Sequence, residues 1–449
     1  MGVDARRRDR SCVKNVLIVA YLFPPTSTIG GGVVRALKFT KYLPQYGWRP
    51  VVLTVRDSFL RQDTSTLSDI PAEATVIRTL QADPRYLTRR SWTDPLGRGG
   101  ARAAKWRRRL SNCCIPDPQV GWLPFAVAEA LKAISRERID AVFTTAPPFT
   151  DHVIGLALRR LTGLPWVADF RDPWVAAGRH AANTRRARLQ GWLEERVLRA
   201  CDAWTTVTDA YRDVICGGDQ EIGAKGRVIP NGFDWEDFPQ TERPAPTAAV
   251  RLAYAGTLYP QRASLALFDA IQRMREQGDD VRLLVGQMAP EIRESRTVQR
   301  LIAQGAVEER GSLPYREALR HLTTLDAFVV TVDRTHPGMV PGKLYEYLAA
   351  GRPVLLLGPR DGAAARLLEM FGEHLVADLD DVNGIEGGIR TLVQFARARR
   401  PPGDRAALAQ FDRRHLTGRL AELLDLVSAT RRSAAATIGG TADSDRAGR

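Results

Sequence analysis

The amino-acid sequence predicts an α/β protein with two domains, each built on a doubly wound parallel sheet. The chain has 449 residues, more than one ordinary hydrophobic core holds, so two domains of roughly 200 residues are expected. Short apolar runs alternate with amphipathic segments, the order that produces parallel strands joined by helical crossovers. The stretch 234–248 is polar, bears prolines and lacks periodicity, so it is predicted to link domains at 14–233 and 249–402.

Composition and missing patterns limit the class of protein. Hydrophobic residues make up 44% and charged residues 26% of the sequence, as in a globular enzyme. The five cysteines form no Cys-x-x-Cys pair, so neither a disulfide framework nor a zinc site is indicated, and a reducing cytoplasm is expected. No apolar run approaches the roughly 18 to 20 residues that span a bilayer. Residues 1–13 are expected to be a disordered basic lead.

The first predicted unit is a strand, a glycine loop and a helix. The apolar run Val16–Ala20 forms the strand, and Gly30, Gly31 and Gly32 open the helical pattern Val33–Tyr46. Glycines at such a turn let the backbone approach a phosphate closely. The full Gly-x-Gly-x-x-Gly pattern is absent, so a dinucleotide site is only weakly supported.

Strands at 51–55 and 75–80 follow, and then a strongly basic stretch. From Arg85 to Arg109, nine cations and the tryptophans Trp92 and Trp106 accompany one acid, Asp94. The cations are Arg85, Arg89, Arg90, Arg98, Arg102, Lys105, Arg107, Arg108 and Arg109. Such a stretch suits an anionic membrane surface, at about 1 kcal/mol per cation, and an ordinary solvated loop fits equally well. The net charge of +14 indicates an anionic partner, but no nucleic-acid recognition motif is present.

Polar residues follow two strands of the first domain. After the helix 123–136 and the strand 141–145, Thr150 is predicted to cap a helix whose first turn carries His152. A structural and a functional role for this histidine are equally plausible. The next strand ends in Asp169, Arg171 and Asp172. Acids at strand ends lie at the ligand crevice of an α/β sheet, and the alternative is an arginine that only satisfies its neighbours in a structural network.

The remaining elements complete two alternating α/β units. The first domain ends with a charged helix at 185–200, a strand at 203–207 and a last strand at 227–233. The second domain has strands at 251–255, 281–286, 306–311, 327–332 and 353–357, with helices at 265–277, 290–304, 315–323 and 342–350. A helix is expected within 403–428 and a disordered tail at 429–449.

Two segments of the second domain suggest a phosphate site. Gly256, Thr257 and Arg262 follow its first strand, where backbone amides and a guanidinium could cradle a diphosphate. Further on, a Pro/Gly-bearing loop enters a helix that carries Lys343 and Glu346 three residues apart, on one helical face. The pair could meet a phosphate and sugar hydroxyls of one nucleotide, or form a surface ion pair.

The segment Pro-Gly-Lys-Leu-Tyr-Glu-Tyr-Leu-Ala-Ala-Gly-Arg-Pro-Val at 341–354 resembles the donor site of retaining GT-B glycosyltransferases with a Glu-x7-Glu signature. Glu346 matches the second glutamate, which holds the donor ribose in that family. Gly338 stands in place of the first, although a related subgroup carries Pro-x-Lys-x-x-Glu-Tyr here. Asp169 to Trp174 resembles the acceptor-side Asp-x-Arg-Asp-x-Trp of bacterial surface-polysaccharide glycosyltransferases. The resemblance extends over 16–426.

The resemblance implies a GT-B fold with the site between two facing Rossmann-like domains. It implies retaining sugar transfer from a nucleotide-sugar donor to a glycan or lipid-linked acceptor, in the cytoplasm or at the inner membrane face. Its donor site corresponds to Gly256, Thr257, Arg262, Lys343 and Glu346, and the Gly30 to Gly32 loop closes on the donor phosphates. Asp172, with His152 as second choice, would align or deprotonate the acceptor hydroxyl.

Neither a cofactor nor a metal is expected. The two Asp-x-Asp sequences, at 378–380 and 443–445, lie outside the predicted site. Two alternatives to a glycosyltransferase remain at this level, namely an epimerase-like enzyme on the same fold and a non-catalytic nucleotide-sugar binding protein.

Overall fold

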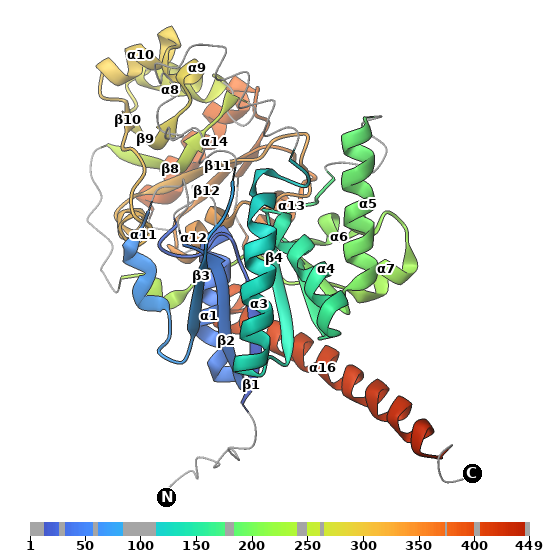
Figure 1. Ribbon diagram of the computed structural model, residues 1–449. Coiled ribbons are helices and arrows are strands. Elements are labelled where there is room, and N and C mark those ends of the chain that lie inside the picture. The colour runs from blue at the N-terminus through green and yellow to red at the C-terminus, as the bar shows by residue number, and fades with distance from the viewer. Residues whose placement is uncertain are drawn as a thin grey trace, which may run out of the picture.

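The computed structural model contains two domains, each with one parallel β-sheet between helices (Figure 1). The structure describes residues 13–26, 32–56, 62–83, 114–175, 184–239, 249–260, 265–372, 375–398 and 405–444. Each sheet carries hydrophobic clusters on both faces, which accounts for the nearly continuous apolar strands. None of the helices in these ranges is both long and apolar enough to cross a bilayer.

The first sheet has seven parallel strands in the order β3-β2-β1-β4-β5-β6-β7. They are β1 (Lys14–Val19), β2 (Trp48–Val55), β3 (Thr75–Thr79), β4 (Ala141–Ala146), β5 (Trp166–Phe170), β6 (Ala203–Thr206) and β7 (Gly226–Val228). The helices are α1 (Gly32–Tyr42), α3 (Leu123–Glu137), α4 (Thr150–Thr162), α5 (Arg185–Ala200), α6 (Asp209–Cys216) and α7 (Gln220–Lys225). The strand order reverses between β1 and β4, and sheets of this type bind ligands above such a reversal.

The second sheet has six parallel strands in the order β10-β9-β8-β11-β12-β13. They are β8 (Val250–Leu258), β9 (Val281–Met288), β10 (Val307–Glu309), β11 (Ala327–Thr331), β12 (Val354–Leu357) and β13 (Leu375–Ala377). The helices are α8 (Ala266–Glu276), α9 (Pro290–Arg293), α10 (Arg296–Ala303), α11 (Tyr315–Thr323), α12 (Gly342–Ala349), α13 (Ala363–Glu369) and α14 (Val382–Arg397). Here the order reverses between β8 and β11, so the carboxyl ends of these strands frame the second possible ligand edge.

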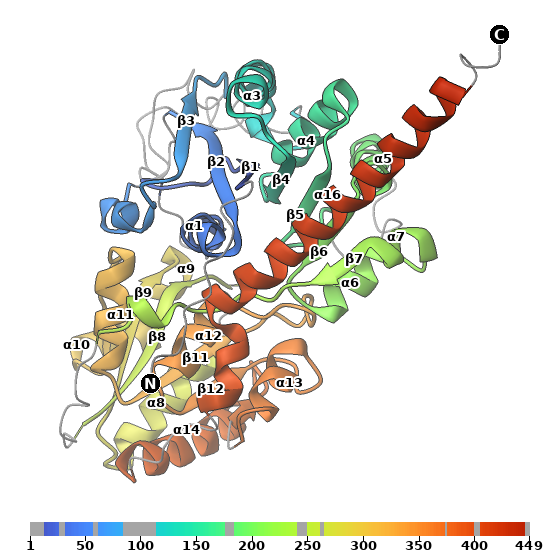
Figure 2. The same ribbon diagram turned by 90° about the horizontal axis from the view of Figure 1, so that it is seen from below.

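The C-terminal part of the chain returns to the first domain. After α15 (Arg405–Leu408), helix α16 (Arg413–Ser444) runs along that domain (Figure 2). Leu416, Leu420 and Leu424 of α16 are fully buried in one cluster with residues of β1 and α1. The helix continues to Ser444, whereas the sequence predicts a disordered tail from residue 429. The run Ala434 to Ala436 explains the difference, because alanine has the highest helix propensity.

Two other expectations differ from the structure at the level of single elements. Thr150 does not cap α4 but is its first helical residue, and its hydroxyl donates to Asp117 Oδ1 at 2.6 Å. The helix expected at 33–46 ends at Tyr42, and a 3-10 turn over Leu43–Tyr46 follows it. Pro44 causes this change, because it interrupts the α-helical hydrogen bonds.

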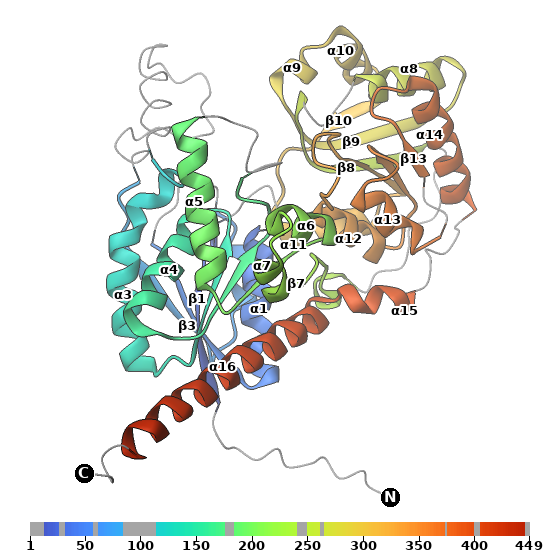
Figure 3. The ribbon, with the colours of Figure 1, turned by 90° about the vertical axis from the view of Figure 1, so that its right-hand side faces the viewer.

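The chain crosses between the domains twice, and the two crossings lie side by side. Phe233 N–H donates to Phe411 O at 3.2 Å, and Arg413 N–H donates to Phe233 O at 2.8 Å. Figure 3 shows the two domains beside each other, with α16 running from α15, under the second domain, along the first domain. The first residues of the predicted linker are therefore ordered, and Asp234 is only 1% exposed.

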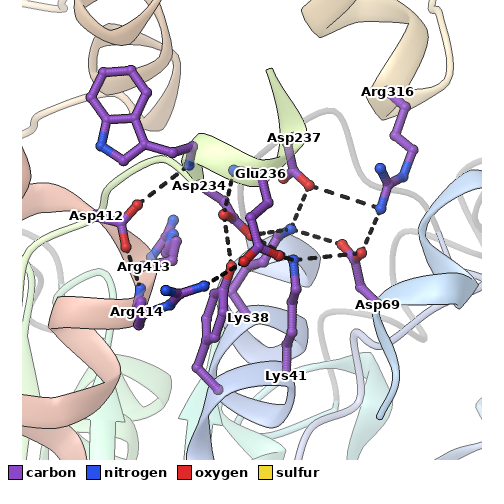
Figure 4. Close-up of polar contacts among 12 residues, drawn as sticks. Lys38, Lys41, Asp69, Asp234, Glu236, Asp237, Arg316, Asp412, Arg413 and Arg414 are labelled. Carbon is purple, nitrogen blue, oxygen red and sulfur yellow. Dashed lines mark hydrogen bonds and ion pairs between the residues drawn. The ribbon is translucent and has the colours of Figure 1, made fainter. Parts of the chain in front are cut away.

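A cluster of charged side chains surrounds this junction (Figure 4). Lys38 of α1 is fully buried and donates to Asp69, Asp234 and Asp237 at 2.6 to 2.7 Å. Arg316 of α11, in the second domain, pairs with Asp69 of the first domain. The first domain, the crossing segment and the second domain thus share one network of charges.

Candidate functional site

A pocket of about 360 Å³ lies between the two domains, at the carboxyl edge of the second sheet. The second domain supplies most of its wall, from the ends of β8, β9 and β10 and from helices α11 and α12. Thr26, Val33 and Val34 line it from the first domain. The volume lies in the range of pockets that hold small molecules.

Helix α12 directs its first turn at this pocket. Its N-cap is Pro341, which makes no side-chain capping bond, so no cap satisfies the N–H groups of Gly342 and Lys343, while Leu344 N–H donates to Pro341 O at 2.9 Å. Gly342, Lys343 and Glu346 line the pocket together. The structure therefore brings Lys343 and Glu346 to one face of a helix, as their spacing predicts, and places a positive helix end beside them.

The turn after β8 lies against Lys343. Gly256 has a φ of +133°, which disfavours a side chain, and the backbone of Gly286 approaches it closely. A Cβ atom at Gly256 would lie 3.1 Å from Lys343 Nζ. This ammonium also sits 3.6 Å from the centre of the Tyr254 ring. The cation is thus held directly over the glycine turn.

Thr257 completes this wall of the pocket. It lines the pocket beside Gly256, and its hydroxyl donates to Gln287 Oε1 at 3.3 Å. Arg262 lies outside the described residues. Gly256, Thr257, Lys343 and Glu346 are the predicted donor-binding residues that the structure brings together.

Glu346 lies in surroundings that disfavour its charge. Burial raises the pKa of its carboxyl to about 7, and the charge of Asp237 acts in the same direction. Arg413, a hydrogen bond from Tyr315 and the charge of Lys343 lower it. At neutral pH the carboxyl is therefore divided between its acidic and ionised forms.

Packing against Arg171 explains why Gly32, the last residue of the first-domain glycine loop, is a glycine. A Cβ at Gly32 would come 1.9 Å from Arg171 Nη1, so the guanidinium fills the space against the start of α1. Arg171 Nε donates to Ala146 O at 3.0 Å, and Nη2 donates to Pro147 O. For Arg171 the structure therefore shows the structural network that the sequence left as an alternative. Gly30 and Gly31 lie outside the described residues.

His152 is fully buried and does not line the pocket. Trp166 Nε1 donates to Thr144 Oγ1 at 3.0 Å, and the same hydroxyl is hydrogen-bonded to His152 Nδ1, 2.8 Å away. Burial lowers the pKa of His152 to about 3, and the ring is neutral at pH 7. The role of His152 toward an acceptor therefore stays a prediction.

Asp172 is exposed at the end of β5 and is also not among the residues that line the pocket. Its role toward an acceptor stays a prediction. Asp378 and Asp380 of the first Asp-x-Asp sequence both pair with Arg334. Within the described ranges, no group of three or more His, Cys, Asp or Glu side chains could hold a metal ion.

Tyr315 and Arg413 are among the pocket residues that the sequence did not indicate. Tyr315 opens α11 and hydrogen-bonds Glu346, and Arg413 enters from the returning C-terminal segment. Neither stands in a recognisable motif. Only the packing of the domains brings them beside α12.

Comparison with known proteins agrees with this architecture. A family model described as Glycosyltransferase Family 4 matches residues 29–237, which is most of the first domain. No curated protein matches the chain.

Solved structures with the same arrangement cover nearly all of the chain. An α,α-trehalose-phosphate synthase from Burkholderia vietnamiensis is 14% identical with a TM-score of 0.62, covering 93% of this chain and 100% of its own. Anabaena HepE in complex with UDP-glucose is 14% identical with a TM-score of 0.60, covering 92% and 99%. WaaG, a glycosyltransferase of lipopolysaccharide biosynthesis, is 14% identical with a TM-score of 0.53, covering 92% and 98%. The likeness confirms the predicted GT-B fold.

Proposed function

We propose that this chain is a retaining glycosyltransferase, which moves a sugar from a nucleotide-sugar donor to a glycan or lipid-linked acceptor in cell-surface polysaccharide synthesis. The observation that carries the proposal is the convergence of Gly256, Lys343, Glu346 and the open N-terminus of α12 in one interdomain pocket. The family match in the first domain and the GT-B fold support it. Retention is supported by the resemblance of the donor segment alone.

The chemistry of this pocket suits the expulsion of a nucleoside diphosphate from an anomeric carbon. Negative charge develops on the leaving phosphates, and its stabilisation is usually the largest contribution to such a reaction. Lys343 and the first amides of α12 supply positive charge at one place, and Arg262 is proposed to add to it. Glu346 offers a carboxylate for sugar hydroxyls, and Asp172 is proposed on the acceptor side. We propose that no metal is required.

Nucleotide binding and transfer test the proposal together. The wild-type protein should gain thermal stability from a nucleoside diphosphate or nucleotide sugar, and should transfer the sugar rather than only release UDP or epimerise the donor. Lys343→Ala and Glu346→Ala should each weaken nucleotide binding by about 1.5 to 3 kcal/mol, because each loses a charge-assisted contact. Lys132→Ala, an exposed lysine of α3, is the matched control. Unchanged calorimetric affinity in both pocket variants would refute the donor site.

A lipid-linked acceptor would require work at a membrane, and we propose that Arg85 to Arg109 provides the contact. These residues lie outside the described ranges, and their composition supports the idea. The protein should co-sediment with anionic vesicles at low salt and be released by salt, since each cation adds about 1 kcal/mol and surface charges are screened. Replacement of five of the arginines by serine should abolish binding. Equal sedimentation of wild type and variant would contradict this contact.

A further inference from the structure

Arg413 is held rigidly at the wall of the pocket. It is the first residue of α16, lines the pocket, and is only 2% exposed. Its N–H donates to Phe233 O, and its carbonyl accepts from Thr417 Oγ1 at 2.7 Å. Both crossings therefore fix the backbone from which this side chain extends.

The guanidinium of Arg413 keeps donors that the protein does not use. Its Nε and Nη1 atoms have no hydrogen-bond partner among the described residues. Burial, followed by the charge of Arg35, lowers its pKa to about 10, so it remains charged at neutral pH. A buried charge with unsatisfied donors is costly to keep in a fold. The next residue differs, because Arg414 is about half exposed and pairs with Glu236 (Figure 4).

The surroundings of Arg413 favour a hydroxyl group over a phosphate. Tyr315 and Glu346 are the nearby acidic groups that most favour the charged form of the guanidinium. A phosphate at this place would be repelled by Glu346 once it ionises. A hydroxyl can bind Arg413 and Glu346 together, because its hydrogen is donated to a carboxylate while its oxygen accepts from a guanidinium. A guanidinium and a carboxyl in one wall therefore suit a sugar diol, such as the ribose of a nucleotide.

We propose that Arg413 is a ligand-binding residue that donates to a ribose hydroxyl oxygen, while Glu346 accepts from the hydroxyls of the same ribose. This rests on the proposed function, which places a nucleotide in the pocket, and it assigns part of the donor site to the C-terminal crossing segment. Since Nε and Nη1 pair with no described residue, loss of Arg413 should reduce affinity without reducing the stability of the unliganded protein.

The test compares Arg413→Gln with Arg414→Gln, using UDP, 2′-deoxy-UDP and 3′-deoxy-UDP in calorimetry. Arg413→Gln should bind UDP at least about tenfold more weakly than the wild type does. Its loss of affinity relative to the wild type should be smaller for the deoxy analogue that lacks the contacted hydroxyl. Arg414→Gln should bind all three as the wild type does. The melting temperature of unliganded Arg413→Gln should equal or exceed that of the wild type.

A pH series adds a second readout. The groups that act on Glu346 are Asp237, Tyr315, Lys343 and Arg413. Without the Arg413 cation, the pKa of Glu346 should rise further, so that UDP binding by Arg413→Gln improves more between pH 6.5 and 8.5 than binding by the wild type does.

The outcomes separate this proposal from the proposed function. If the wild type binds none of UDP, GDP and ADP, the proposed function fails first. If the wild type binds UDP, and Arg413→Gln either binds it equally or loses UDP and both deoxy analogues to the same degree, the ribose contact is wrong and the nucleotide site stands. Lower melting temperatures for both Arg413→Gln and Arg413→Lys would assign Arg413 a structural role instead.

Discussion

Glu346 illustrates how a single site residue can act against stability. Its pKa is raised to about 7 in the folded protein, mainly by burial, against an ordinary value of 4.5. Between these two values the folded chain holds a proton that the unfolded chain has released. The stabilising contribution of Glu346 to the free energy of unfolding is therefore present below pH 4.5. It is lost as pH rises toward 7, by about 1.4 kcal/mol per pH unit.

Glu346→Gln should remove this dependence, because glutamine keeps the shape and cannot ionise. We expect the unfolding free energy of the variant, relative to the wild type, to increase from pH 5 to pH 7 in urea titrations, while nucleotide affinity falls. Glu317→Gln, at an exposed position of α11, is the control and should show no such trend. A difference between variant and wild type that is independent of pH would contradict the raised pKa.

The candidate site was predictable where its residues depend on local geometry. Lys343 and Glu346 are three residues apart, and helix geometry alone places them on one face. Arg413 was not predictable, because a long-range crossing brings it to α12 and its local sequence resembles an ordinary helix start. Gly32 was predictable as a close-contact position, but its contact with the guanidinium of Arg171 was not.

At the scale of elements, the loop before α12 explains the departure from the Glu-x7-Glu signature. Thr208 Oγ1 donates to the carbonyl oxygen of Gly338 at 2.8 Å, and a Cβ at Gly338 would lie 2.9 Å from the Tyr211 ring. Helix α6 of the first domain thus occupies the space that a glutamate side chain would need. In this chain residue 338 contacts the first domain instead.

Most strands and helices were predictable from periodicity, but α6, α7 and several elements near the end of the second domain were not expected. β13 has three residues, too few for a periodic pattern, and was missed together with α13 and α14 around it. The single helix expected at 290–304 is divided into α9 and α10, with Ser295 as the N-cap of the second. Apolar spacing alone does not show such a break.

At the scale of the whole molecule, the arrangement of the domains depends on the charge cluster at the crossings. Burial opposes ionisation of Asp234, yet the ammonium groups of Lys38 and Lys41 lower its pKa to about 2. Arg316 brings the second domain into the same network through Asp69. These five side chains come from four separate segments, so no local pattern in the sequence could reveal that they meet.

Lys38→Met should therefore weaken the whole molecule more than a surface change would. Methionine approximates the length of the lysine stem but leaves Asp69, Asp234 and Asp237 without their shared cation. Breaking a buried charge network in this way costs about 3 to 5 kcal/mol, which urea unfolding at pH 7 would measure. The loss should shrink at pH 5, because the freed carboxylates take up protons more readily in the folded variant than in the wild type.

Lys132→Met, which removes an exposed partner of Glu129, should leave the unfolding curve unchanged. A loss below about 1 kcal/mol for Lys38→Met, or an equal loss at both pH values, would show that the domains are held together by apolar packing instead.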